Sequence, residues 1–163
     1  MANTGRTTSK WLKFITGDSG NDTLREIPIN TLSVVGIVYD EQDLTAFQDA
    51  VKGLLPNMPD APVDIGGPLD TTAAQTVAQG LSGSHTVIAP IVGAMTPLSL
   101  DIRFGIRAAW STGEPQFGIT ATATSGYICT GYSVNPSDMT YSATFKLYPG
   151  SSVPAWGTAA ETT

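Results

Sequence analysis

The chain has 163 residues, which is the size of one domain, and its 41% apolar content is sufficient for a packed core. Eight Lys and Arg residues against 14 Asp and Glu residues give a formal net charge of −6, which argues against electrostatic binding to nucleic acid. The charge is concentrated, because residues 40–70 hold one basic and seven acidic residues. The single cysteine, Cys129, excludes an intramolecular disulfide and a CxxC metal site.

Residues 1–10 are small, polar and mildly basic, and this composition predicts an N-terminal arm that extends to about residue 15. The next apolar residues, Trp11, Leu12, Phe14 and Ile15, are too hydrophobic for a free tail. We therefore expect them to dock on this subunit or on another one. The start lacks the apolar stretch of a signal peptide and no segment is long enough to cross a membrane, so we expect a cytosolic product with no membrane contact.

Two elements are predicted before residue 60. The β-branched run at 32–39 indicates a strand, and Pro56 and Pro59 end the segment that follows it. Between them, apolar residues recur at intervals of three and four, which predicts a helix over residues 44–55. The apolar positions are Leu44, Phe47, Val51, Leu54 and Leu55.

An acidic cluster, Asp40, Glu41 and Asp43, precedes this predicted helix. Acidic residues are favoured at a helix start because the backbone N–H groups are exposed there. The same cluster could bind a hard cation or supply paired carboxylates, but it lacks the regular spacing of a calcium loop. The helix start is the simpler interpretation.

The middle of the chain predicts a short strand at 63–66 and a second, Ala-rich helix at 72–79 that ends near Gly80. The C-terminal half is clearer, because apolar residues alternate strictly with polar ones. Four strands in succession indicate an antiparallel meander, and the chain should be mainly β, an antiparallel sandwich or barrel with one or two flanking α-helices. The strands are expected at 98–106, 117–123, 127–134 and 139–147.

The tail at 150–163 should be flexible, with Trp156 as its single point of attachment. Arg103 and Arg107 share a strand face with Asp101, which indicates a solvated face or a pair between subunits. The strand faces opposite the apolar side repeat Thr and Ser and have few charges. Because uncharged edges tend to pair with neighbouring sheets, these strands favour an obligate assembly over a monomer.

The inventory for catalysis is short. His85 is the only histidine, and it lies near a predicted strand without a GxSxG elbow or a matching cysteine context. No GxGxxG or GxxxxGK[ST] segment is present to bind phosphates. We therefore expect a structural histidine, no catalytic residues, no metal, no cofactor and no enzymatic activity.

Three segments together resemble the major tail tube protein of bacteriophages with long, non-contractile tails. They are the D-x-T-x-F segment at 43–47, the proline-containing turn at 55–61, and the strand and hydrophobic-Asp pair at 63–70. The resemblance continues through the alternating strands to about Gly150. Gln48 and Asn57 depart from it, since that family often has glycine there.

The resemblance implies a β-sandwich or barrel with a flanking helix, six copies in a ring, and rings stacked into a tube that conducts DNA into the host. The protein would then be a virion component with itself, the tape measure, the terminator and the distal tail proteins as partners, and DNA would pass without specific binding through a negatively charged lumen. It also implies that residues 40–60 form a long loop, which conflicts with the predicted helix, and that 72–80 is the helix. The arm and this loop would make contacts between rings, through Trp11, Leu12, Phe14, Ile15, Asp43, Thr45, Phe47, Pro56 and Asp60.

Three alternatives remain open. The protein could be another virion component, either a capsid decoration protein or a tail terminator. It could also be a β-sandwich carbohydrate-binding module, because Trp110 and Trp156 could stack on sugars. An enzyme is the least supported alternative.

Overall fold

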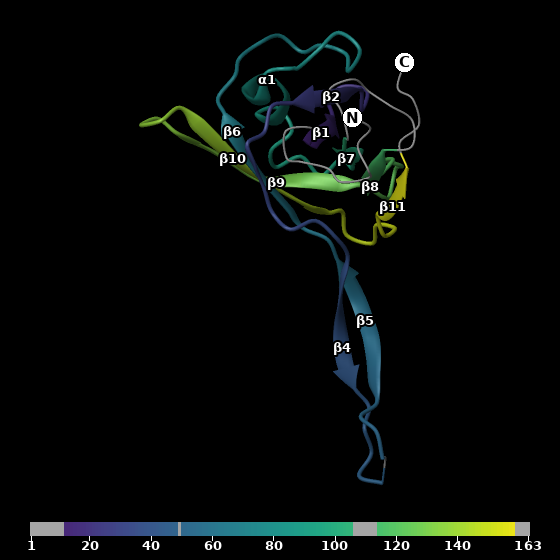
Figure 1. The fold of residues 1–163 in the computed structure, drawn as a ribbon. Helices are drawn as coiled ribbons and strands as arrows, with labels where there is room; N and C mark the ends of the chain where they lie inside the picture. Colours follow the sequence, from purple (N-terminus) through teal and green to yellow (C-terminus); the bar gives the residue numbers. More distant parts are fainter. Residues whose placement is uncertain (1–11, 49, 106–113, 159–163) are drawn as a thin grey trace, which may run out of the picture.

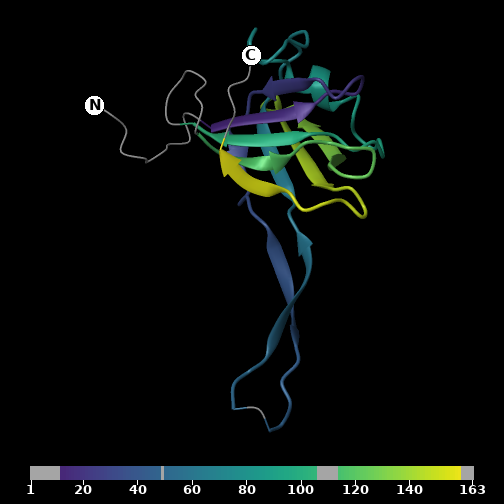
Figure 2. The same ribbon diagram turned by 90° about the vertical axis from the view of Figure 1, so that its right-hand side faces the viewer.

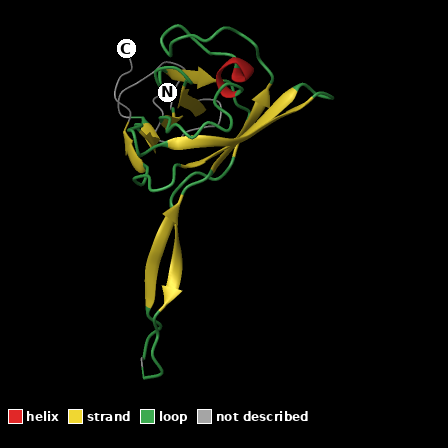
Figure 3. Cartoon of the chain, turned by 180° about the vertical axis from the view of Figure 1, so that it is seen from behind, coloured by secondary structure: helices red, strands yellow, loops and turns green. Residues whose placement is uncertain are grey.

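The computed structural model describes residues 12–48, 50–105 and 114–158. Two antiparallel β-sheets pack against each other, one short helix lies beside them, and a two-stranded ribbon projects from the body (Figures 1 and 2). Figure 3 shows how strongly strands predominate in the described residues. The mainly β sandwich with one flanking helix is therefore confirmed.

The larger sheet has five strands and the smaller has four, and every strand pair within them is antiparallel. The five-stranded sheet has the order β11 (Ala155–Thr158), β8 (Pro115–Ile119), β7 (Leu100–Phe104), β1 (Leu12–Gly17) and β2 (Leu24–Ile27). The four-stranded sheet has the order β3 (Thr31–Leu32), β6 (Val63–Pro68), β10 (Thr140–Leu147) and β9 (Tyr127–Asn135).

The core lies between these sheets and follows from the alternation along each strand. In the larger sheet Phe14 pairs with Ile102 and Ile27, and all three are buried. In the smaller sheet Phe145 is opposite Val63, and its ring lies 5.5 Å from that of Phe14 in the other sheet. The two apolar strand faces therefore meet in one core.

The prediction of the last strands is confirmed in part. Strands β6, β9 and β10 match the expected ranges closely, but β7 and β8 are shorter than expected. The single meander is wrong, because β7 and β8 belong to the five-stranded sheet whereas β9 and β10 belong to the four-stranded one. Alternation identifies the buried face of a strand but does not identify the sheet that it joins.

The predicted strand at 32–39 is wrong in its middle. It divides into β3 and β4 (Val38–Asp43), which lie in different sheets, and residues 33–37 connect them. The N–H of Ser33 donates to the carbonyl of Asp64 (2.9 Å) and its hydroxyl accepts from the Asp64 N–H (3.0 Å). The chain therefore leaves the four-stranded sheet at this point and enters the ribbon.

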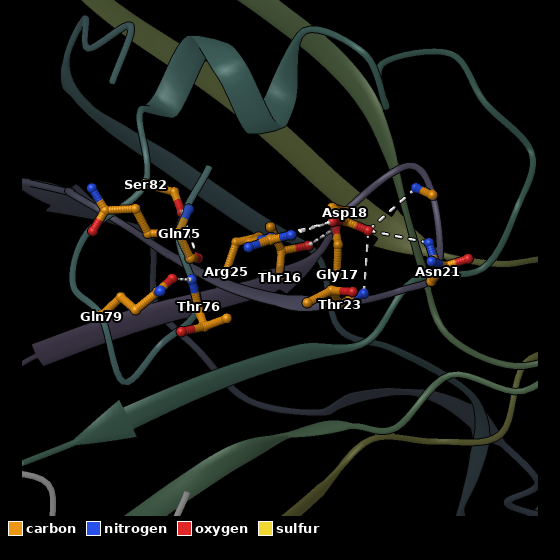
Figure 4. A network of polar contacts seen from close by, with 11 residues as sticks. Thr16, Gly17, Asp18, Asn21, Thr23, Arg25, Gln75, Thr76, Gln79 and Ser82 are labelled. Atoms are coloured by element: carbon orange, nitrogen blue, oxygen red, sulfur yellow. Dashed lines mark hydrogen bonds and ion pairs between the residues drawn. The ribbon is translucent and has the colours of Figure 1, made fainter. Parts of the chain in front are cut away.

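The predicted helix at 72–79 is also wrong, and the resemblance to tail tube proteins placed the helix incorrectly too. The hydroxyl of Ser82 donates to the carbonyl of Gln75 (3.0 Å) and accepts from its N–H (2.9 Å), as Figure 4 shows. Such side-chain bonds to the backbone compete with helical bonds. The helix instead is α1 (Ser84–Ile88), five residues that contain His85.

Beside this loop, hydrogen bonds to the carboxylate of Asp18 fix the turn after β1. One carboxylate oxygen of Asp18 accepts the N–H groups of Gly20, Asn21 and Thr23, and the other accepts two bonds from Arg25 (Figure 4). Burial acts to raise the pKa of Asp18, but the bonds from Arg25 and these N–H groups outweigh it and lower the pKa. The hydrogen bonds of Asp18 therefore stabilise the turn within this chain.

Residues 44–55 are not a helix. The segment is the end of a hairpin in which β4 pairs with β5 (Leu54–Asp60), with Gln42 opposite Leu55 and Asp43 opposite Leu54. An isolated helix of fewer than about 12–15 residues is marginal in water without a surface to pack on, and this segment projects away from the body. A helix at 44–55 would therefore have no surface of this chain to pack on. The predicted helix start at Asp40 and Glu41 is also wrong, because both residues belong to β4.

The tail at 150–163 is not irregular throughout. Strand β11 pairs with β8, and the Trp156 ring lies 4.9 Å from that of Phe117 and 5.6 Å from that of Phe104. These ring contacts agree with attachment through Trp156, but Trp156 is not the single point of attachment, because β11 pairs with β8 along its length and the N–H of Ser152 donates to the hydroxyl of Ser125 (3.0 Å).

Candidate assembly surfaces

The ribbon, which we define as residues 38–60, is closed at its tip by short polar contacts. The N–H of Leu44 donates to the carbonyl of Gly53 (2.9 Å), and the N–H of Gly53 donates to the hydroxyl of Thr45 (2.8 Å). Asp43 accepts from the N–H of Thr45 (2.9 Å) and lies 3.9 Å from the ammonium of Lys52. Hydrogen bonds from Thr45 lower the pKa of Asp43, so the carboxylate is charged at neutral pH.

The base of the ribbon is joined to the core. Asp60 accepts the N–H of Ala61 (2.8 Å), and the buried Ala61 accepts the phenol O–H of Tyr127 at 2.8 Å. Burial, with a smaller contribution from the Asp60 charge, raises the pKa of Tyr127, so the phenol stays protonated as the donor. The ribbon therefore has a fixed origin on the four-stranded sheet.

Along its length the ribbon exposes large apolar side chains. A two-stranded hairpin is marginally stable at best in water, and contiguous apolar patches on a protein surface commonly mark interaction sites. The exposed fractions range from 45% at Leu54 to 112% at Phe47. The exposed apolar residues are Val38, Tyr39, Leu44, Phe47, Val51, Leu54, Leu55 and Met58.

The sequence-predicted contact residues divide between this ribbon and the core. Five of them lie on the ribbon. Asp60 is at the base of the ribbon, and the other four lie further from the body. Phe47 is the most exposed large apolar residue of the described chain. The five are Asp43, Thr45, Phe47, Pro56 and Asp60.

The other predicted contact residues belong to β1. Phe14 and Ile15 are fully buried in this chain and Leu12 packs beside its core, so residues 12–15 are a strand between β2 and β7 rather than part of an arm. Phe14 and Ile15 therefore dock on this subunit, which is one of the two expected alternatives, and the contact with another ring is wrong for them because neither is exposed in this chain. Trp11 lies outside the described residues.

Asp101 and Arg103 form an internal pair. Their Oδ2 and Nε atoms are 2.9 Å apart, and both side chains are largely buried. Burial raises the pKa of Asp101, although the hydrogen bond and charge of Arg103 oppose the shift. The alternatives of a solvated face and an intersubunit pair are both wrong for these two residues. Arg107 lies outside the described residues.

More charge is buried on the same side of the five-stranded sheet. Lys13 is opposite Arg103 in the β1–β7 register, and its ammonium lies 3.6 Å from the carboxylate of Glu114. Burial raises the pKa of Glu26, while the charges of Lys13 and Arg103 act in the opposite direction. Sequence reasoning missed these buried pairs, because single charges in alternating strands look like solvent-facing positions.

The four-stranded sheet has a solvent-facing side of small polar residues. The Ser133 and Ser142 hydroxyls lie 3.0 Å apart, and the Thr144 hydroxyl donates to Asp64 at 2.7 Å. Lys146 is exposed on the same side. The Thr and Ser repeats predicted this surface, which has two exposed charges of opposite sign among mostly hydroxyl groups.

This sheet also ends in two edge strands, β3 and β9. Isolated bridges from Val92 and Leu98 reach only the first part of β9, at Cys129 and Tyr127. The uncharged stretch from Thr130 to Val134 continues beyond those bridges. Such an edge can pair with a strand of another chain.

The described residues were also compared with the requirements of metal sites, histidine chemistry, membrane spans and ligand pockets. Among the described residues there is no group of three or more His, Cys, Asp or Glu side chains placed to hold a metal ion. His85 is exposed, and its Nδ1 lies 2.8 Å from the hydroxyl of Tyr132. No helix in residues 12–48, 50–105 and 114–158 is long and apolar enough to cross a membrane. A hollow of about 360 Å³ beside β7 and β8 is lined by Asp22, Ser99, Asp101 and Gln116, among others.

Comparison with known proteins bears on the fold. No protein family model and no curated protein matches the sequence. Among solved structures, the chain is similar to one in the cryo-EM structure of the anti-feeding prophage cap, the AFP tube terminating cap, with a TM-score of 0.61 and 10% identity. The match covers 98% of this chain and 95% of that one. The chain therefore shares its fold, over nearly its whole length, with a protein from a tube cap.

Proposed function

We propose that the chain is a structural virion protein, a subunit of the tube of a phage tail or a tail-like particle, and that it is not an enzyme. The observation that carries the proposal is the projecting ribbon, whose exposed apolar residues need a partner. The fold shared with a protein of a tube cap supports the same class of function. A β-ribbon directed away from the body suits contact with another ring of the same protein.

The four-stranded sheet is suited to the wall of such a tube. In the proposed ring of six copies, its edge strands β9 and β3 pair with those of neighbours and close a barrel of ~24 strands. With a strand spacing of ~4.8 Å and a tilt of ~40°, the backbone circumference is ~150 Å and the diameter ~48 Å. Side chains reduce that opening, and the remaining width is sufficient for a DNA duplex.

The solvent-facing side of that sheet would line the lumen. Its hydroxyl groups and its single Asp64 and Lys146 make it nearly neutral. DNA would pass without specific binding because few cations are available to hold phosphates. In this proposal most of the acidic excess belongs to the ribbon, and a lumen lined by hydroxyl groups takes the place of the expected negatively charged lumen.

The proposed partners are other copies of this chain and the tail proteins that begin, measure and end a tube, namely the distal tail, tape measure and terminator proteins. No cofactor and no membrane contact are part of the proposal. The protein would be made in the host cytoplasm and would reside in the virion tail.

A tube terminator is the second candidate, and the similar chain in a tube terminating cap favours it. A capsid decoration role has no comparable support. The carbohydrate-binding alternative rests on Trp156, whose ring contacts those of Phe104 and Phe117 and which is 53% exposed. This single side chain gives that alternative less support than the shared fold gives a tube protein. Trp110 lies outside the described residues.

The test is negative-stain electron microscopy of the purified chain over a concentration series. A tube subunit should form rings and hollow tubes of indefinite length, whereas a terminator should form single rings that do not stack on themselves. A persistent monomer that binds polysaccharide would exclude both. Deleting residues 1–11 provides a second measurement, because loss of tube growth with an intact fold is expected if the arm joins rings.

A further inference from the structure

A hollow on the outer face of the five-stranded sheet has no role in the proposed tube. Gly118 on β8 lies opposite Asp101 on β7, and their chain neighbours Phe117 and Ile102 are fully buried in the core. Gly118 and Asp101 therefore lie on the face away from the core. Because glycine has no side chain, residue 118 does not fill the space beside Asp101, and the hollow there has a volume of about 360 Å³. This volume is within the range of ~300–1,000 Å³ that is usual for ligand sites.

The polar groups that line the hollow all offer oxygen atoms. Two are carboxylates, one from Asp101 and one from Asp22 in the turn after β1. The others are the side-chain amide of Gln116 and the hydroxyls of Ser99 and Thr120. None of the described residues that line the hollow has a basic side chain. The hollow therefore suits a ligand that is positively charged.

Two of these oxygens are buried and have no hydrogen-bond partner. They are Oδ1 of Asp101 and Oε1 of Gln116. The other carboxylate oxygen of Asp101, Oδ2, accepts a hydrogen bond from Nε of Arg103 at 2.9 Å. Burial raises the pKa of Asp101 even with this pair in place, as expected for a carboxylate whose charge is incompletely compensated. Buried polar atoms normally have partners, and an ion is one explanation for an exception.

The carboxylate of Asp22 is held beside the hollow by Ser99. It accepts the Ser99 N–H at 2.9 Å and the Ser99 hydroxyl at 2.6 Å. The same hydroxyl accepts the N–H of Ala121 at 2.8 Å, so Ser99 positions Asp22 and is already fully engaged. Asp22 forms no ion pair with a basic residue in the described part of the chain. Arg103 compensates one of the two carboxylates, and one negative charge remains.

We propose that this hollow binds a hard divalent cation, Ca²⁺, through oxygens of Asp22, Asp101 and Gln116, with water completing the coordination. Ca²⁺ takes six to eight oxygen ligands at ~2.3–2.6 Å in flexible geometry and combines carboxylates with neutral oxygens. Mg²⁺ requires a near-ideal octahedron and fits such a mixed set less well. The bound ion connects the turn after β1 to β7 and β8, and so fastens this turn to the outer face of the sheet.

The site differs from those that a sequence motif can reveal. The expected absence of a metal rested on the single histidine, the single cysteine and the lack of a calcium-loop spacing. The proposed ligands come from three separate segments and share no spacing. The described residues contain no group of three or more His, Cys, Asp or Glu side chains placed to hold a metal ion, and this site has only two carboxylates. We therefore expect weak binding, with a Kd of ~10⁻⁴–10⁻³ M.

The experiment is isothermal titration calorimetry of CaCl₂ into the chelator-treated full chain at constant ionic strength. Gln116→Leu removes one ligand oxygen without changing the charge or the Asp101–Arg103 pair. Asp101→Asn removes a charged ligand. Asp40→Asn is the matched control, because it removes the same charge from an exposed position on the ribbon. Urea unfolding checks that each variant is folded, and MgCl₂ is titrated for comparison.

The wild type and Asp40→Asn should bind Ca²⁺ with the same Kd, whereas Gln116→Leu and Asp101→Asn should each raise the Kd at least tenfold. Binding of Mg²⁺ should be weaker than that of Ca²⁺. A wild type that does not bind Ca²⁺ would overturn the inference. A Kd that rises in Asp40→Asn but not in Gln116→Leu would overturn it too, because the ion would then be attracted by the acidic ribbon. The proposed tube function does not depend on the result, since it is tested by particle assembly.

Discussion

Two phenylalanines offer a matched test of how the molecule divides its apolar surface. Phe145 on β10 is 0% exposed, whereas Phe47 at the ribbon tip is 112% exposed. Replacing each with alanine removes the same atoms. In the monomer, Phe145→Ala should cost about 3–5 kcal/mol, from lost burial and the cavity that it leaves. Phe47→Ala should change the free energy of unfolding by less than about 0.5 kcal/mol.

Urea unfolding of the dilute monomer, followed by circular dichroism, measures both effects. With a denaturant slope of about 2 kcal/mol/M, Phe145→Ala should lower the urea midpoint by about 1.5–2.5 M. The Phe47→Ala midpoint should coincide with that of the wild type. A loss of more than about 1 kcal/mol in Phe47→Ala would show that the ribbon tip already packs on its own body.

The same substitution should act on assembly. Fully burying a phenylalanine contributes about 1.5–3 kcal/mol, which corresponds to a factor of about 10–150 in the concentration at which copies associate. Phe47→Ala should therefore raise that concentration within this range. An unchanged assembly concentration in Phe47→Ala would mean that the tip is not part of the interface.

Three further outcomes are expected in the subunit. Asp22→Ala should cost about 1–3 kcal/mol in urea, because the Asp22 carboxylate accepts the N–H and hydroxyl of Ser99 at 2.9 and 2.6 Å; an unchanged midpoint would contradict this. Gly118→Ala should cost at least about 1–3 kcal/mol in the same assay, because the alanine Cβ would clash with the carbonyl oxygen of Leu100 on the paired strand β7. A variant as stable as the wild type would contradict this close approach of the two strands. Glu26→Gln tests the pH dependence: burial raises the pKa of Glu26 in the folded state, so wild-type stability falls as pH rises from the usual carboxyl range through the raised pKa. The stability of Glu26→Gln relative to wild type should therefore increase with pH, and urea midpoints between pH 4 and 8 with no such trend would count against the buried charge.

The strands with a complete core-facing pattern could be predicted from sequence. Along β10, Tyr141, Ala143 and Phe145 are buried and the residues between them face outward, as the alternation requires. What the pattern could not provide is the partner. Strands β8 and β9 follow each other in the chain but join different sheets, since pairing depends on long-range packing.

The two wrong helices have related causes. The apolar residues from Leu44 to Leu55 are exposed in the single chain. Their spacing indicates an apolar surface, but it does not specify whether this chain or another one covers that surface. At 72–79 the apolar spacing permits a helix, yet the hydroxyl of Ser82, seven residues after Gln75, forms hydrogen bonds with the N–H and the carbonyl of Gln75. Helix α1 has only five residues, too few to show a helical period.

The residues of the candidate interface could be predicted only in part, because apolar residues of the core and of the ribbon look alike in the sequence. Phe14 and Phe47 are alike as apolar residues in sequence, and only the fold places one in the core and the other on the ribbon. The acidic excess at 40–70 was visible as a count, whereas its placement on a projecting hairpin required the β4–β5 register.

Oxidative footprinting of the methionines tests the ribbon as an assembly surface most directly. Met58 on the ribbon is 80% exposed in the single chain, and Met95 and Met139 on the body serve as internal references. Peptide mass spectrometry should find Met58 readily oxidised in the dilute monomer and strongly protected in concentrated, assembled protein. Equal oxidation of Met58 in both states would mean that copies associate without covering the ribbon, and the proposed role of the ribbon would be wrong.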